Sequence, residues 1–70
     1  MPSLTWHDAD EIGFRLHEKF GDLDPLTVRF TDLHRRVTEL EGFDDDPDLA
    51  DETLLEAIQM AWYDYWREDS

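Results

Sequence analysis

The sequence contains no cysteine and few basic residues, and each scarcity excludes classes of protein. Without a thiol the chain forms no disulfide, no thiolate metal site and no cysteine nucleophile. Six Lys and Arg stand against nineteen Asp and Glu, for a net charge of −13, so we expect no binding to nucleic acid or to anionic membranes. No apolar run approaches the ~18 residues that span a bilayer, and the N-terminus does not resemble a signal peptide. We therefore expect a cytoplasmic protein.

Glycine and serine are also scarce, which argues against catalysis. Three glycines cannot build a glycine-rich phosphate loop. The two serines, Ser3 and Ser70, lie at the chain ends. His7, His17 and His34 are far apart in sequence, and the nearest acid to His34 on its own helix, Asp32, lies two residues away, where side chains do not face each other. We therefore predict that the protein is not an enzyme.

The chain nevertheless has enough apolar material for one small core. Its seventy residues are 40% hydrophobic and 13% aromatic. We predict a single domain over residues 1–70 and a monomer. Its stability should be modest, because a domain of this size buries only roughly 60–65% of the surface that its unfolded chain exposes.

The spacing of apolar residues predicts three helices. The first has Asp8 as its N-cap, with Glu11 completing a capping box, and ends at Gly21. Phe14 lies outside its apolar stripe. That stripe comprises Ala9, Ile12, Gly13, Leu16 and Phe20.

The second predicted helix is short, with Thr31 as its N-cap and Gly42 at its end. The third begins after a cap at Asp48 or Asp51 and has a broad apolar face. That face comprises Leu54, Leu55, Ile58, Ala61, Trp62, Tyr65 and Trp66.

Between the first two helices, residues 27–30 are β-branched and aromatic, which predicts a brief strand. Residues 4–6 could pair with it. The predicted fold class is therefore mainly α, with three helices and at most a very small β element.

The most unusual segment is the acidic loop, residues 43–51, between the second and third helices. Seven of the twelve residues from 41 to 52 are acidic and none is basic, so their carboxylates repel one another until a cation or a basic surface approaches. One interpretation is a solvated surface in which Asp48 and Asp51 cap a helix. This explains three adjacent aspartates poorly, because a cap needs only one.

Calcium binding is a second interpretation, since Asp44, Asp46 and Asp48 alternate like the first ligands of an EF-hand loop. The pattern then fails, because Leu49 stands where glycine is required and Leu55 where a bidentate glutamate is required. What remains is a set of hard oxygen donors suited to iron, manganese, magnesium or calcium, without a preformed cage. We expect weak metal binding.

Two segments indicate a family. The segment DPLTVRFTDLH at residues 24–34 and the segment GFDDDP at residues 42–47 closely resemble the IscX family, small acidic proteins of bacterial iron–sulfur cluster assembly. Ile12 and Gly13 also fit, as does LEAIQMAW at residues 55–62. The resemblance spans about residues 4–64.

This resemblance implies a small, modified winged-helix domain made of three helices. It also implies an adaptor that binds the cysteine desulfurase IscS, overlaps there with bacterial frataxin, and binds iron, as Fe²⁺ or Fe³⁺, weakly and transiently. The family is associated with iron donation or with regulation of the desulfurase. Many winged helices bind DNA through a basic helix, but the region after Arg36 is acidic, so the analogy does not extend to DNA.

The chain departs from the family pattern at several positions. Arg35 and Arg36 stand where Gln-Trp is common, Thr38 where Cys is common, Glu41 where Pro is common and His7 where Thr is common. The two arginines place a basic spot beside the second helix, which could weaken or redirect docking on a basic partner.

We therefore predict two overlapping sets of site residues. The metal-binding set is Asp44, Asp45, Asp46, Asp48, Asp51 and Glu52. The partner-binding set is Glu39, Glu41, Asp44, Asp45, Asp46 and Asp48. The alternative is a dedicated weak metal-ion carrier without a specific protein partner.

Overall fold

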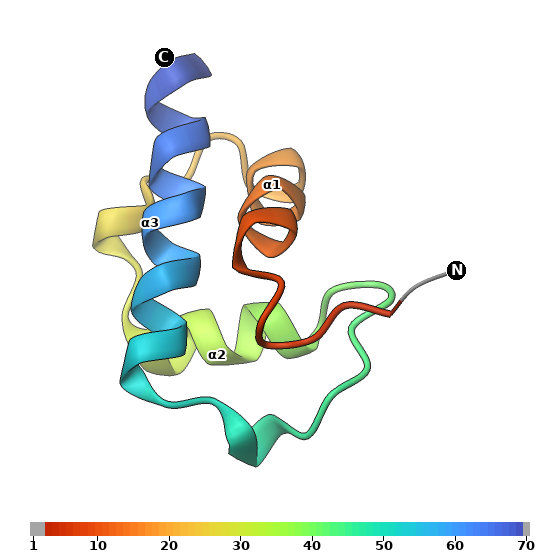
Figure 1. Ribbon diagram of the computed structural model, residues 1–70. Coiled ribbons are helices and arrows are strands. Elements are labelled where there is room, and N and C mark those ends of the chain that lie inside the picture. Colours follow the sequence, from red (N-terminus) through yellow and green to blue (C-terminus); the bar gives the residue numbers. More distant parts are fainter. Residues whose placement is uncertain (1–2, 70) are drawn as a thin grey trace.

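The computed structural model describes residues 3–69, and its regular structure consists of helices (Figure 1). The three α-helices are α1 (Ala9–Lys19), α2 (Phe30–Thr38) and α3 (Glu52–Asp69), and two short 3₁₀ helices, η1 (Pro25–Thr27) and η2 (Pro47–Leu49), lie in the connections. The prediction of a mainly α domain with three helices is confirmed. None of the helices in the described part of the chain has the length and apolar character needed to cross a membrane.

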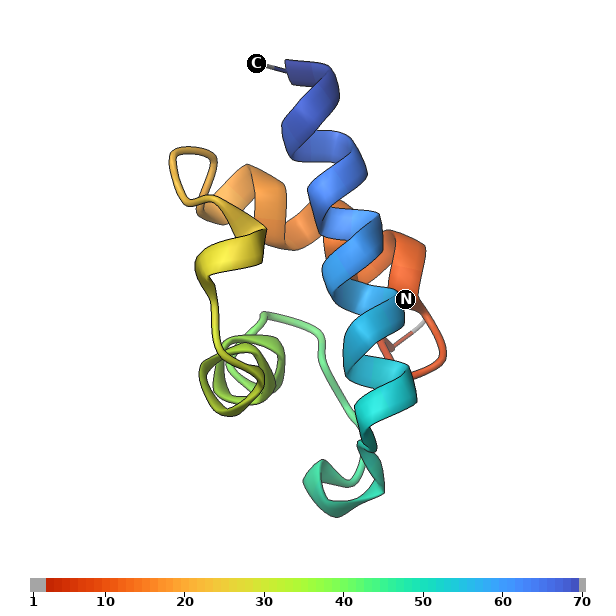
Figure 2. The same ribbon diagram turned by 90° about the vertical axis from the view of Figure 1, so that its left-hand side faces the viewer.

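The helices α1 and α3 cross each other closely, and α2 lies across one end of the pair (Figure 2). Gly13 permits this crossing. A Cβ atom at Gly13 would lie 2.7 Å from the backbone nitrogen of Trp62 and 2.9 Å from the Cβ atom of Ala61, both on α3. Only a residue without a side chain therefore fits between the two helices at this point.

One core fills the space among the three helices. The predicted apolar stripe of α1 faces it, since Ile12, Gly13 and Leu16 are buried, and Phe14 is 40% exposed as expected. From α3, Ile58 and Trp62 are fully buried. The complete set of buried hydrophobic residues is Leu4, Trp6, Ile12, Leu16, Val28, Leu33, Val37, Leu40, Leu55, Ile58 and Trp62.

The predicted strand at residues 27–30 is wrong. The carboxylate of Asp24 accepts a hydrogen bond from the Leu26 amide (3.0 Å), and Pro25 begins the 3₁₀ turn η1. Only Val28 and Arg29 are extended before α2 begins. The N-terminal segment pairs elsewhere, because Leu4 forms an isolated parallel bridge with Phe43.

The predicted capping box at α1 is also wrong. Asp8 is the N-cap residue, but its side chain makes no hydrogen bond to the helix. Its Oδ2 atom accepts from the Thr5 amide instead (2.9 Å), which closes a turn before α1. Glu11, the other expected partner, forms an ion pair with Arg15 at 3.1 Å. The Asp8 side chain thus stabilises the turn that precedes α1 rather than the first turn of the helix.

The helix α2 begins and ends earlier than predicted. Its N-cap is Arg29 rather than Thr31, and no side chain caps it. The helix ends at Thr38, and Gly42, with φ of 87°, ends the turn that follows. For α3, one of the two predicted caps is confirmed, because Oδ1 of Asp51 accepts from the Leu54 amide at 2.8 Å.

We predict that Gly13→Ala lowers the free energy of unfolding by about 1–3 kcal/mol, because the added methyl group must push α1 away from the backbone of α3. Urea denaturation monitored by circular dichroism measures the change. Gly21→Ala is the matched control, since its Cβ would meet only the His17 carbonyl oxygen at 3.3 Å. Equal stability of the two variants would contradict the close crossing.

Candidate functional site

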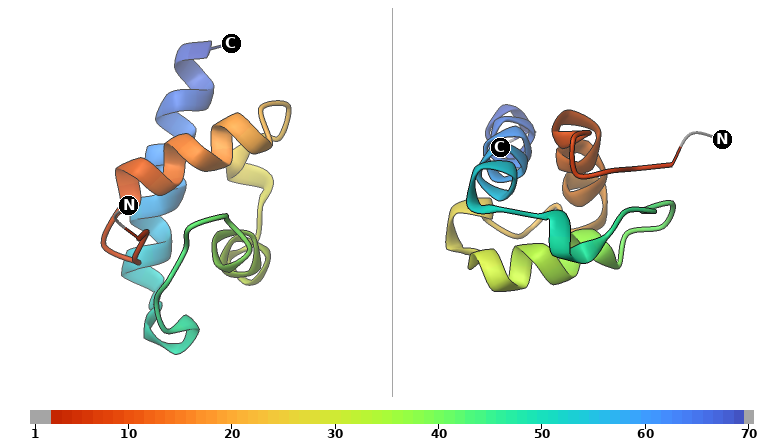
Figure 3. Two further views of the ribbon diagram at one scale, coloured as in Figure 1. Left: turned by 90° about the vertical axis from the view of Figure 1, so that its right-hand side faces the viewer. Right: turned by 60° about the horizontal axis from the view of Figure 1, so that its bottom comes forward.

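The acidic loop runs from the turn after α2 to the start of α3, with the N-terminal segment beside its first part (Figure 3). Two backbone hydrogen bonds join these segments. The Leu4 amide donates to the Gly42 carbonyl and the Asp44 amide donates to the Leu4 carbonyl, each at 2.9 Å. The loop is therefore held against the body of the protein at its first residues.

Trp6 fixes the middle of the acidic loop. This side chain is fully buried, and its indole Nε1–H donates to the Asp46 carbonyl at 2.7 Å. The Trp6 backbone amide donates to Oδ2 of Asp45 at 3.1 Å. The Phe43 ring packs edge-on against the indole, with centroids 4.9 Å apart. One aromatic residue thus holds three successive parts of the loop.

His34, on α2, provides a second attachment. Its Nε2 atom lies 2.6 Å from the Pro47 carbonyl oxygen, and because a carbonyl only accepts, this nitrogen bears the hydrogen. The imidazole also packs on the indole of Trp6, with centroids 5.2 Å apart. The tip of the acidic loop is consequently tied to both α2 and the core.

Three carboxylates of the acidic loop have structural roles. Besides the Trp6 amide, Asp45 accepts from the Asp46 amide (2.8 Å). Asp46 accepts from the Asp48 amide (2.9 Å) at the start of η2. Asp51 caps α3. These hydrogen bonds satisfy backbone donors that would otherwise lack a partner within the protein.

The other acidic residues of the region project into solvent. Among the residues that the structure describes, their carboxylates make no hydrogen bond or ion pair, and all five residues are exposed. This set, here called the free carboxylates, comprises Glu39, Glu41, Asp44, Asp48 and Glu52. The structure thus divides the predicted acidic residues into those that hold the loop and those that remain available to a cation or a partner.

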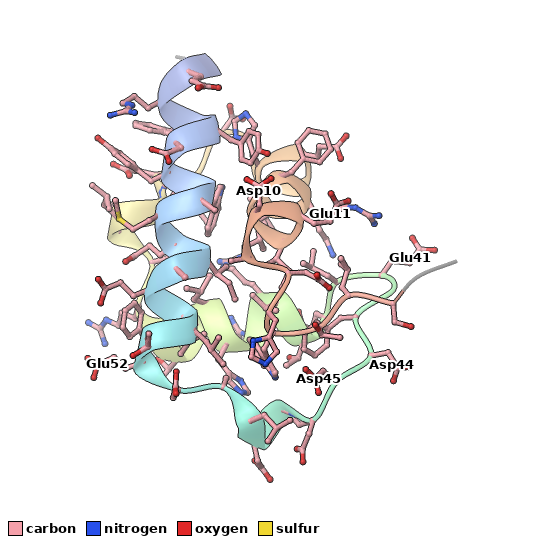
Figure 4. All side chains as sticks on the ribbon, viewed as in Figure 1. Asp10, Glu11, Glu41, Asp44, Asp45 and Glu52 are labelled. Carbon is pink, nitrogen blue, oxygen red and sulfur yellow. The ribbon has the colours of Figure 1, made fainter. Side chains whose placement is uncertain are left out.

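The predicted metal ligands are spread along the loop. Figure 4 shows Glu52 at the α3 end, whereas Asp44 lies toward the opposite end, near Glu41 of the predicted partner-binding set. Within residues 3–69, no three acidic or histidine side chains are grouped so that they could hold one metal ion. Iron binding stays a prediction.

The two arginines of α2 do not form one basic spot. Arg35 lies 3.7 Å from the carboxylate of Asp32 on the exposed surface. The guanidinium of Arg36 lies over the Phe20 ring at 4.6 Å from its centroid. The positive charges of these neighbours therefore engage different groups, and one of them is placed against the end of α1.

Sequence reasoning missed Trp6, His34 and Phe43 as the residues that position the acidic loop. A signal for His34 exists, because it follows Leu33 on the apolar side of α2 and lies three residues before Val37. No comparable signal exists for Trp6, whose partners lie 39 and 40 residues later in the chain.

By its fold and site, this protein is a small helical domain that presents an ordered acidic loop. Comparison with known proteins then gives the family. Residues 4–67 match the family described as iron-sulphur cluster assembly, and the chain belongs to this family, which is the IscX family. It is 50% identical over 60 residues to the uncharacterized protein PA3808 of Pseudomonas aeruginosa, an alignment covering 86% of this chain and 91% of that protein.

We predict that Asp45→Ala lowers the free energy of unfolding by about 1–3 kcal/mol, because it leaves the Trp6 amide without its acceptor. Asp44→Ala is the matched control, as that carboxylate has no partner and its removal reduces repulsion. Urea denaturation of both variants should show stability lost only in the first. Equal losses would mean that the two aspartates have the same role.

Proposed function

We propose that this member of the iron–sulfur cluster assembly family is a non-enzymatic adaptor that docks on a basic surface of a cysteine desulfurase through its free carboxylates. The strongest support is that some carboxylates of the acidic loop accept backbone hydrogen bonds whereas others make none. Asp45, Asp46 and Asp51 hold the backbone, so Asp44, Asp48 and Glu52 are exposed on an ordered frame. Solvation alone would not require so many acids on an anchored segment.

An anchored loop favours docking for two physical reasons. First, ordering is already present before the partner arrives, so less conformational entropy is lost on binding. Second, the carboxylates repel one another in the free protein, and a basic surface relieves that repulsion. Charged residues of one sign also accelerate encounter with a partner of the opposite sign. Overlap with the site of bacterial frataxin on the desulfurase belongs to the same proposal.

Iron is the second component of the proposed function. Asp44 and Asp48 are hard oxygen donors without competing hydrogen bonds, which suits Fe²⁺ or Fe³⁺ as a transient cargo. The described residues include no three possible ligands that are already grouped around one position. Several exposed carboxylates must therefore move together to hold one ion. We therefore expect weak binding, suited to delivery or to regulation rather than to storage.

The alternative function is a metal carrier whose contact with protein is incidental. The spread of the carboxylates between the α2 and α3 ends of the loop favours the adaptor, because a broad surface suits a protein partner better than a single ion. Desulfurase binding in iron-free buffer separates the two, since a carrier would not bind there.

We predict that Asp44→Lys or Asp48→Lys weakens desulfurase binding about three- to tenfold in iron-free buffer, measured by calorimetry with the purified enzyme. Asp45 and Asp46 are unsuitable targets, because their replacement also releases the loop. Asp22→Lys is the matched control. It makes the same change in net charge on an exposed residue of the connection between α1 and η1. That connection lies far from the acidic loop (Figure 1).

The same binding should weaken as salt rises, because the Debye length shrinks from ~30 Å at 0.01 M to ~8 Å at physiological ionic strength. If the loop variants bind as tightly as Asp22→Lys, the proposed docking surface is wrong. An affinity that is independent of salt would also count against it.

We predict that Mg²⁺ or, under anaerobic conditions, Fe²⁺ raises the Tm by relieving repulsion among the free carboxylates. Each kcal/mol of stabilisation should shift the Tm by about 4–8 °C in a domain of this size. The double variant Asp44→Asn and Asp48→Asn should start with a higher Tm and gain less from either cation. Thermal scans with both cations test this, and an equal gain in the double variant would place the cation elsewhere.

A further inference from the structure

An open cleft of about 430 Å³ lies between α1 and the C-terminal half of α3. The acidic loop precedes the other end of α3 (Figure 1). Phe14, His17, Tyr65 and Glu68 line it. Its volume falls within the range of small-ligand sites, roughly 300–1,000 Å³. The cleft is therefore distinct from the surface of the proposed function and needs its own explanation.

Two aromatic rings form the walls of this cleft. Phe14 and Tyr65 pack edge-on with centroids 5.5 Å apart, and Phe14 stays 40% exposed. The Tyr65 hydroxyl donates to Oδ1 of Asp10 at 3.2 Å, which holds the phenol ring in place. Figure 4 shows Asp10 between the two helices. The Tyr65 ring is thus held by Asp10 and by contact with Phe14, and the Phe14 ring stays partly open to solvent.

The polar groups around the cleft are nearly all acceptors. Asp10 and Glu68 are exposed carboxylates, and the Tyr65 oxygen has already used its hydrogen on Asp10. Partial burial, the bond to Asp10, and the charges of Asp10, Glu11 and Glu68 raise the pKa of Tyr65. The electrostatic potential around the Tyr65 hydroxyl is therefore negative. His17 also lines the cleft, and this residue has an interaction within the protein.

The basic residues of α1 and α3 engage other groups. Arg15 pairs with Glu11 on α1 at 3.1 Å. Arg67 lies over the Tyr63 ring, 5.7 Å from its centroid, and pairs with Asp64. Lys19 lies 5.7 Å from the centroid of the Phe20 ring. None of these three cations lines the cleft; among the described residues, the basic side chain that does is His17.

We propose that this cleft binds an arginine side chain presented by a basic segment of a partner protein. A guanidinium is planar, stacks on aromatic faces and offers five N–H donors with no acceptor. It therefore matches the Phe14 and Tyr65 rings, the two carboxylates and the phenol oxygen together. A lysine ammonium satisfies the charge but does not stack as a plane, so it binds more weakly.

The test uses the whole protein, labelled with ¹⁵N and with ¹³C in its aromatic rings, and the probe acetyl-Gly-Arg-Gly-amide at pH 7.5. The matched probe replaces arginine by citrulline, which keeps the shape, removes the charge and adds an acceptor. We expect the arginine peptide to shift the ring resonances of Phe14 and Tyr65, and the citrulline peptide to leave them in place. Equal shifts with both peptides would overturn the proposal.

Variants locate the interaction. Phe14→Leu keeps an exposed apolar side chain but removes the ring, and Asp10→Asn removes one charge. Each should weaken the arginine peptide at least about threefold, whereas Asp44→Asn should not. Shifts confined to residues 43–52, or unchanged affinity in both cleft variants, would contradict the cleft as the site. Because the desulfurase experiment uses the other end of the molecule, either proposal can fail without the other.

Discussion

The indole N–H of Trp6 lies inside the core and needs a hydrogen-bond acceptor there. The position of the acidic loop depends on that acceptor. That acceptor is the Asp46 carbonyl, forty residues later in the chain. Losing it would leave a buried donor unsatisfied, at a cost of about 1–3 kcal/mol. Asp45 meets the same need for the backbone amide of Trp6. The path of an exposed acidic segment is therefore set by a residue of the core, and the directions of its side chains follow from that path.

This dependence explains how so many acids can lie close together in a small domain. Asp45, Asp46 and Asp51 accept backbone hydrogen bonds, so part of their charge is offset by amide dipoles. The side chains of the free carboxylates accept no such hydrogen bond, so their charge remains available to a basic surface. Under the proposed function, stability and recognition therefore depend on different members of one short segment. A residue from each group can look identical in the sequence, as Asp44 and Asp45 do.

The sequence predicts the three helices and most of the core, because apolar spacing reflects which face of a helix is buried. It predicts the start of α2 poorly, since Arg29 is its N-cap and makes no side-chain capping bond. The strand expected at residues 27–30 fails because Pro25 directs the chain into a 3₁₀ turn and only Val28 and Arg29 are extended. For the candidate site, the location of the acidic loop is predictable. The roles of its members depend on contacts with Trp6 and His34, which no local pattern reveals.

The bridge between Leu4 and Phe43 also has a consequence for the order of folding. Closing a loop of this length costs entropy, so we expect these contacts to form after α1 and α3 have packed. The same contacts can open while the helices stay in place, as a local unfolding event. A partner that requires the closed arrangement then binds only the closed fraction of molecules. Its apparent affinity would be reduced by that fraction, so under the proposed function the N-terminal segment would influence how strongly the acidic loop binds.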